Sequence, residues 1–317
     1  MTRTTRRGLL ALPLVAGLGR VARAAGPIRV GVLKFGTVSW ELDVMRQHGL
    51  DTAHGVEVTA VDYATNQAGQ VALQGGRVDM IVGDWLFVSR QRTEGADWSF
   101  VPFSNASGGL VVPAASTVRD LRGVAGKRLG VAGSPLDKSW LVLRAYATRK
   151  FGLDLEHATE RSFAAPSLLL EQMRAGRLDA MLTFWPFAAK AQAEGMRRVL
   201  TVEEALRGLG IEAGVPVIGY TFSERWAAGM GKQLDGFIAA TRQARAILGA
   251  DDAEWARIAP LTGTADAGEL AAVRDWYRSG IPREWGTAGR EAAARSWWAP
   301  PPRSRPGRSG RRAGTRR

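Results

Sequence analysis

The feature of this sequence that most constrains its fold is an internal repeat with an offset of about 100 residues. Two short stretches occur twice, in the same order and at nearly the same spacing. The first copy has Arg29-Val30-Gly31-Val32 before Ser39-Trp40 and Arg77-Val78-Asp79 before Trp85, and the second has Arg128-Leu129-Gly130-Val131 before Ser139-Trp140 and Arg177-Leu178-Asp179 before Trp185. This repetition predicts two lobes built on one plan.

Both copies show strands alternating with helices. Short apolar runs predict strands at 28–33, 56–61, 78–82, 128–131 and 178–183, and apolar positions at helical spacing predict helices at 40–49, 139–151 and 187–195. Such alternation is typical of α/β units with mainly parallel sheets. We therefore expect an α/β protein with two Rossmann-like lobes.

Each repeated tryptophan follows a predicted strand, at the turn into a helix. Ligands of open parallel sheets bind outside the carboxyl ends of the strands. We expect at least three of Trp40, Trp85, Trp140 and Trp185 to face a cleft between the lobes. The alternative is that they are core residues, because tryptophan is buried on average.

The net charge of +13 belongs mostly to the two ends of the chain. Residues 1–24 hold five arginines and residues 301–317 hold seven, and neither stretch has an acidic residue. The part between them is almost neutral and lacks the field that attracts nucleic-acid phosphates. We therefore predict no nucleic-acid partner.

The residue types present also argue against catalysis. The chain has no cysteine, which excludes cysteine nucleophiles and cysteine-bound metal, and its three histidines are scattered. We find no Ser-His-Asp order, no metal-spaced set and no glycine-rich phosphate loop. We predict no enzyme activity, no cofactor and no metal.

The N-terminal segment 1–24 is predicted to be a secretory signal peptide. Basic residues precede an apolar stretch from Leu9 to Leu18, and Ala22-Arg23-Ala24 is typical of a cleavage site. Thr5–Leu10 also resembles the twin-arginine (Tat) motif, with an ordinary Sec signal as the alternative. We expect cleavage near Ala24, a periplasmic location and a soluble mature protein, since no later run of 18 apolar residues follows.

From residue 299 the chain consists mainly of Pro, Arg, Gly and Ser. Because these residues offer nothing large to bury, we predict a disordered basic tail at 299–317. A frame error at the gene end and a nucleic-acid-binding tail are the two explanations for it.

Three stretches resemble one known family. They are Ile28-Arg29-Val30-Gly31, then Asp120-Leu121-Arg122-Gly123 with Gly126–Val131, and finally Leu178–Phe187. In this order they are similar to periplasmic substrate-binding proteins of the nitrate/taurine/aliphatic-sulfonate (NitT/TauT) ABC importer family. Family members often have an acidic residue before the proline of the third stretch, where this chain has Trp185.

The resemblance implies a type II periplasmic-binding-protein fold, with mainly parallel sheets and a two-segment hinge. We expect crossings near Leu110–Pro113 and Val215–Tyr220, so that lobe one comprises 27–111 plus 217–298 and lobe two comprises 112–216. The implied function is a monomeric solute-binding component that serves an ABC permease and ATPase. The alternatives are an accessory or sensor protein of a periplasmic enzyme, and an enzyme of the thiamine-pyrimidine type.

The residues suggest two kinds of ligand contact. The loop and helix start around Lys138 would stabilise an anion, or would serve only as a helix cap. Acidic residues beside tryptophans in the first copy would suit an organic cation, or would only complement helix ends. A zwitterion or a flat heteroaromatic ring would satisfy both. The predicted ligand-binding residues are Trp40, Glu41, Asn66, Asp84, Trp85, Ser107, Ser134, Asp137, Lys138, Ser139, Trp140 and Trp185.

Overall fold

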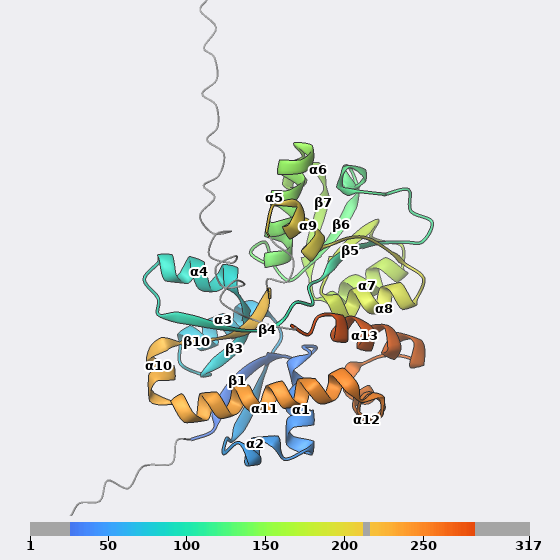
Figure 1. The fold of residues 1–317 in the computed structure, drawn as a ribbon. Coiled ribbons are helices and arrows are strands. Elements are labelled where there is room, and N and C mark those ends of the chain that lie inside the picture. Colours follow the sequence, from blue (N-terminus) through green and yellow to red (C-terminus); the bar gives the residue numbers. More distant parts are fainter. Residues whose placement is uncertain (1–25, 212–215, 283–317) are drawn as a thin grey trace, which may run out of the picture.

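The structure is a computed structural model, and it describes residues 26–211 and 216–282. Within these residues the strands form two five-stranded sheets, each covered by helices (Figure 1). The prediction of two α/β lobes is confirmed.

The sheet of lobe one has the strand order β2-β1-β3-β10-β4. Strands β1, β2 and β3 are parallel, and β10 is antiparallel to both of its neighbours. The sheet is therefore mixed, with one reversed strand. Its strands are β1 (Ile28–Leu33), β2 (Val58–Tyr63), β3 (Met80–Asp84), β4 (Trp98–Ser104) and β10 (Ile218–Ser223).

The sheet of lobe two repeats this arrangement, in the order β7-β6-β8-β5-β9. Strands β6, β7 and β8 are parallel, and β5 is the reversed strand. Its strands are β5 (Gly109–Val112), β6 (Arg128–Ala132), β7 (Glu160–Ala164), β8 (Ala180–Thr183) and β9 (Arg197–Thr201).

Helices cover both sheets, and several begin at a side-chain cap directly after a strand. Those of lobe one are α1 (Val38–Gln47), α2 (Leu50–Ala53), α3 (Asn66–Gln74), α4 (Trp85–Thr93), α10 (Glu224–Gly229), α11 (Gly231–Ala250), α12 (Asp252–Thr262) and α13 (Ala267–Ser279). Those of lobe two are α5 (Lys138–Phe151), α6 (Leu155–Ala158), α7 (Pro166–Arg174), α8 (Trp185–Ala193) and α9 (Val202–Gly208), together with a 3₁₀ turn at Leu121–Val124.

The repeated arginines and aspartates tie equivalent strands together in the two lobes. Arg29 at the start of β1 forms a two-pronged pair with Asp79, with Nη2–Oδ1 and Nε–Oδ2 distances of 2.7 and 3.0 Å. Arg128 at the start of β6 holds Asp179 in the same way, at 2.8 and 3.0 Å. Each pair joins a central strand to the turn before its parallel neighbour, so this part of the repeat is structural.

Two segments of chain connect the lobes. The first lies between β4 and β5, at residues 105–108, and the second lies between α9 and β10. The first crossing therefore precedes the predicted Leu110–Pro113. Our predicted boundary at residue 111 falls inside β5, and this strand pairs within the second sheet. Gly108 is required there, because a Cβ atom would lie 1.8 Å from the carbonyl oxygen of Thr183.

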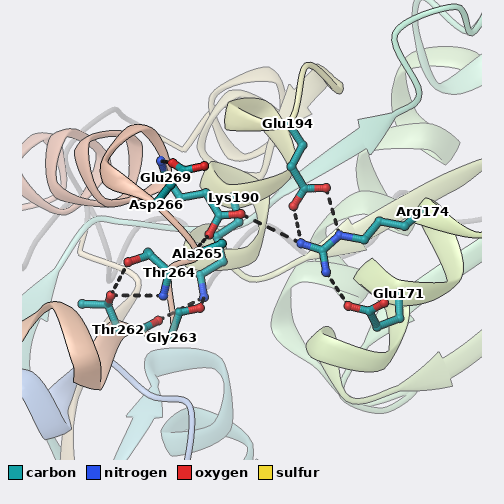
Figure 2. Close-up of polar contacts among 10 residues, drawn as sticks. All are labelled: Glu171, Arg174, Lys190, Glu194, Thr262, Gly263, Thr264, Ala265, Asp266 and Glu269. Carbon is teal, nitrogen blue, oxygen red and sulfur yellow. Dashed lines mark hydrogen bonds and ion pairs between the residues drawn. The ribbon is translucent and has the colours of Figure 1, made fainter.

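Helix α8 of lobe two also packs along α13 of lobe one (Figure 1). Lys190 of α8 donates from Nζ to the carbonyl oxygens of Thr262, at 3.0 Å, and of Gly263, at the end of α12 (Figure 2). Arg174 of α7 lies between Glu171 and Glu194, and its Nη2 is 3.9 Å from Oε1 of Glu269 in α13. We call the Lys190 contacts with α12 the interlobe clasp.

The predicted signal peptide at 1–24 and the predicted tail at 299–317 lie outside the described residues. No helix among the residues that are described is both long and apolar enough to cross a membrane.

Candidate functional site

A cavity between the two lobes is the candidate site. Its volume is about 90 Å³, counted as the space open to the centre of a water molecule. Its lining includes Leu33, Asp84 and Ser104 at the ends of β1, β3 and β4, and Lys138 and Phe184, which follow β6 and β8. The cavity therefore lies where the carboxyl ends of both sheets face each other, which is the usual ligand position in open α/β sheets.

Aromatic rings from both lobes form much of its wall. Phe35 and Phe103 come from lobe one, and Phe184, Trp185 and Phe187 come from lobe two. The ring centroid of Phe35 lies 6.4 Å from that of Phe184 and 5.9 Å from that of Phe187. These rings give the cavity flat apolar surfaces supplied by both lobes.

Asp84 is the acidic group of the cavity. It ends β3 and caps α4, because its Oδ1 accepts a hydrogen bond of 2.8 Å from the Phe87 amide. Burial raises the pKa of the Asp84 carboxyl, and the positive charge of Lys138 opposes part of that increase. The charges of Asp84 and Lys138 therefore interact electrostatically across the space between the lobes.

The start of α5 supplies the second polar region. Asp137 caps this helix by accepting a 2.8 Å hydrogen bond from the Ser139 amide. Lys138 lines the cavity, and its Nζ lies 5.6 Å from the ring centroid of Phe184. Ser139 also lines it, and the buried Oγ of Ser139 has no hydrogen-bond partner among the described residues.

Five of the twelve predicted ligand-binding residues line this cavity, namely Asn66, Asp84, Lys138, Ser139 and Trp185. Ser134 and Asp137 lie beside it in the α5 capping turn, where the Ser134 hydroxyl accepts from the Leu136 amide. Ser107 is buried in the first crossing.

The expectation for the tryptophans is wrong, because Trp185 lines the cavity and the other three do not. Trp140 is 1% exposed and packs against Phe163 in the core of lobe two. Trp40 is buried in lobe one, and its Nε1 donates to the carbonyl oxygen of Leu261. Trp85 is buried at the start of α4. Trp40 and Trp140 belong to hydrophobic cores, where neighbouring elements bury the apolar area of their rings.

Glu41 is also not a cavity residue. It is 1% exposed, and its Oε2 lies 3.0 Å from Nη2 of Arg245. Its Oε1 accepts a 2.8 Å hydrogen bond from the Tyr277 hydroxyl. Glu41 therefore forms a buried ion pair between α1 and α11. The cation that we expected a ligand to supply is supplied by the fold itself.

Sequence reasoning missed several lining residues, among them Phe35, Thr37, Gln70, Phe103 and Phe184. Phe35 and Phe184 come just after strands β1 and β8, so the rule applied to the tryptophans would have found them. Thr37 and Gln70 carry no comparable signal. Among the residues described, no group of three or more His, Cys, Asp or Glu side chains is placed to hold a metal ion.

Two α/β lobes with matched mixed sheets, two crossings and a cavity between them define the periplasmic-binding-protein fold. Among solved structures, the chain is similar to the alkanesulfonate-binding protein SsuA from Xanthomonas axonopodis pv. citri bound to MOPS, with a TM-score of 0.66 and 20% identity over 86% of this chain and 92% of that one. It is also similar to the periplasmic aliphatic sulphonate-binding protein SsuA from Escherichia coli, with a TM-score of 0.66 and 17% identity over 86% and 89%.

A third similar structure is a ligand-binding component of an ABC-type import system from Staphylococcus aureus with zinc bound, with a TM-score of 0.65 and 10% identity over 87% of this chain and 94% of that one. No family model and no curated protein matches the sequence. The comparisons therefore show the fold of this chain.

Proposed function

We propose that this protein is the exported, periplasmic solute-binding component of an ABC importer, and that it captures one small solute in the cavity between its lobes. The observation that carries the proposal is the cavity itself, which combines aromatic walls with polar groups from both lobes. A solute bound there contacts the carboxyl ends of both sheets at once.

The mechanism follows from this placement. A solute that binds both lobes favours the closed arrangement over the open one, because only the closed form offers all its contacts. The crossing at residues 105–108 is part of the hinge. An ABC permease and ATPase would then recognise the closed form of a monomer.

The similar solved structures support this proposal. Two of them are sulfonate-binding proteins, one of which was solved with MOPS, and a third belongs to an ABC-type import system. All three are named for binding, and none for catalysis.

Mass spectrometry of small molecules released from the purified, denatured protein tests the proposal. We expect one solute in a near-stoichiometric amount. Gln70→Trp places an indole in the cavity and should abolish retention, whereas Gln67→Trp on the exposed side of the same helix should not. A protein that retains no solute, and that no member of a small-solute library stabilises, would contradict solute capture.

The genes beside this one distinguish the importer from the accessory role. A neighbouring permease and ATPase would support import. A neighbouring periplasmic dehydrogenase without them would contradict it.

A further inference from the structure

We infer that the solute is a small zwitterion with a flat apolar body, whose cationic group binds Asp84 and whose acidic group binds Lys138 and Ser139. This inference rests on the proposed function. It names the charge and shape of the ligand, and it makes Asp84 the residue that selects a cationic group.

Asp84 has an oxygen available for a ligand. Its Oδ1 is used by the Phe87 amide, while no hydrogen bond to Oδ2 is formed by any other described residue. The carboxyl lines the cavity, and no Lys, Arg or His nitrogen in the described part of the chain lies within 4.0 Å of it. A partly buried carboxylate without a paired cation is costly. A ligand ammonium or protonated ring nitrogen would supply the missing partner.

The start of α5, on the other lobe, holds polar groups that could bind the acidic end of the ligand. Lys138 is 9% exposed and has no carboxylate within 4.0 Å among the residues described, although it lines the cavity. Beside it, the Oγ of Ser139 is buried and unpaired. Both stand in the first turn of the 14-residue helix α5, whose dipole stabilises negative charge. A carboxylate or sulfonate would pair with all three features.

The balance of charge in the cavity argues against a simple anion. Within the described residues, Asp84 and Lys138 are its only charged lining groups, so a lone anion beside Lys138 would also face the Asp84 carboxylate. Arg245, whose guanidinium lies 5.2 Å from the Phe103 ring centroid, is already paired with Glu41. A ligand with both charges would compensate both lobes, because Asp84 belongs to lobe one and Lys138 to lobe two.

The shape of the ligand follows from the apolar wall. Phe35 and Phe103 of lobe one and Phe184 and Phe187 of lobe two line the cavity. A flat apolar body attached to the two charged groups would bury its area against these rings, and aromatic pairs add to the energy of area burial alone.

Four probes test this ligand class by isothermal titration calorimetry. Phenylalanine, phenethylamine and 3-phenylpropionate share one phenylethyl body and carry both charges, the cation alone and the anion alone, and butanesulfonate is a simple aliphatic anion. We expect phenylalanine to bind more tightly than the other three. Asp84→Asn and Lys138→Met should each weaken phenylalanine binding by about tenfold to 100-fold, as expected for one charge-assisted hydrogen bond. Asp154→Asn, at the exposed cap of α6, should leave the affinity unchanged.

Other results would overturn the inference. Butanesulfonate or 3-phenylpropionate binding as tightly as phenylalanine would show that the site selects an anion. Equal affinity of wild type and Asp84→Asn for phenylalanine would show that the Asp84 carboxylate does not bind the cationic group. Failure of all four probes to bind would exclude this ligand class, while a solute released from the purified protein would still support solute capture.

Discussion

Asp84 is a residue whose charge opposes folding. Burial raises the pKa of its carboxyl, so the folded state binds the proton more tightly than the unfolded state, and ionisation at neutral pH costs stability. Asparagine keeps the cap of α4, because it is as good an N-cap as aspartate. We predict that Asp84→Asn raises the free energy of unfolding at pH 7, measured by denaturant titration.

The sign of this effect fixes its pH dependence. The destabilisation is present above the raised pKa of Asp84 and is relieved as the pH falls through it, so the advantage of Asp84→Asn should shrink in acid. A variant that is less stable than wild type at pH 7 would show that the carboxylate is well compensated by the fold. Gain of stability with loss of ligand affinity is the pattern expected of a functional residue.

Asp179 behaves in the opposite way. Hydrogen bonds from Arg128 lower the pKa of its carboxyl to about 2. The stabilisation that the ionised Asp179 gives the folded state is fully present above the unfolded pKa of 3.8, and it is lost as the pH falls toward about 2. Because Arg128 is half exposed and screened by water, we predict that Asp179→Asn costs only about 1 kcal/mol at pH 7. Urea unfolding at pH 7 and near pH 2 measures the effect, and a cost that persists at the lower pH would contradict it.

The sequence supported only part of the candidate site at the scale of residues. Asp84, Lys138 and Ser139 could be predicted because they follow strands and begin helices, and that position alone brings them to the cavity. Glu41 occupies a similar position, but its environment depends on Arg245, which is 204 residues away in the chain. A distant ion pair of this kind leaves no local pattern, so its role could not be derived without coordinates.

At the scale of elements, α8 is fixed to lobe one at both of its ends. Trp185 at its start lies 6.1 Å, between ring centroids, from both Trp40 and Tyr277, and Lys190 near its end forms the interlobe clasp. Burial lowers the pKa of Lys190, so holding its ammonium between the lobes has a free-energy cost that its two hydrogen bonds offset.

We predict that Lys190→Met changes global stability little, because the lost desolvation cost and the lost hydrogen bonds oppose each other. It should instead speed hydrogen–deuterium exchange about tenfold around the end of α12 and the start of α13, where the clasp has been removed. Lys232→Met, at an exposed position of α11, is the matched control. Unchanged exchange across residues 260–268 in Lys190→Met would show that the clasp does not hold these elements together.

The element-scale predictions succeeded where the repeat applied. The matched Arg–Asp stretches correctly indicated equivalent strands in the two lobes, as β1 with β6 and β3 with β8. The packing of α8 on α13 was not foreseen, because α13 comes after the second copy and has no counterpart in the first. Amphipathic spacing in a sequence can predict a helix, but it does not specify which surface the helix covers.

At the scale of the whole molecule, Trp185 couples the two lobes. Its ring lines the cavity and also enters the aromatic cluster of lobe one, whereas the ring of Trp140 lies entirely within the core of lobe two. Loss of Trp185 therefore removes contacts between the lobes, and loss of Trp140 removes contacts inside one lobe. The two positions are matched in residue type and differ in which part of the molecule they stabilise.

We predict that Trp185→Ala increases the radius of gyration measured by small-angle X-ray scattering and weakens solute binding, because the lobes lose an aromatic contact on which closure depends. Trp140→Ala should instead lower the free energy of unfolding by about 3–5 kcal/mol, as for other large core residues, and leave the radius of gyration of the folded protein unchanged. Scattering at a temperature where circular dichroism shows both variants folded makes the comparison valid. Equal radii for Trp185→Ala and wild type, together with undiminished solute binding, would show that the crossings alone set the arrangement of the lobes.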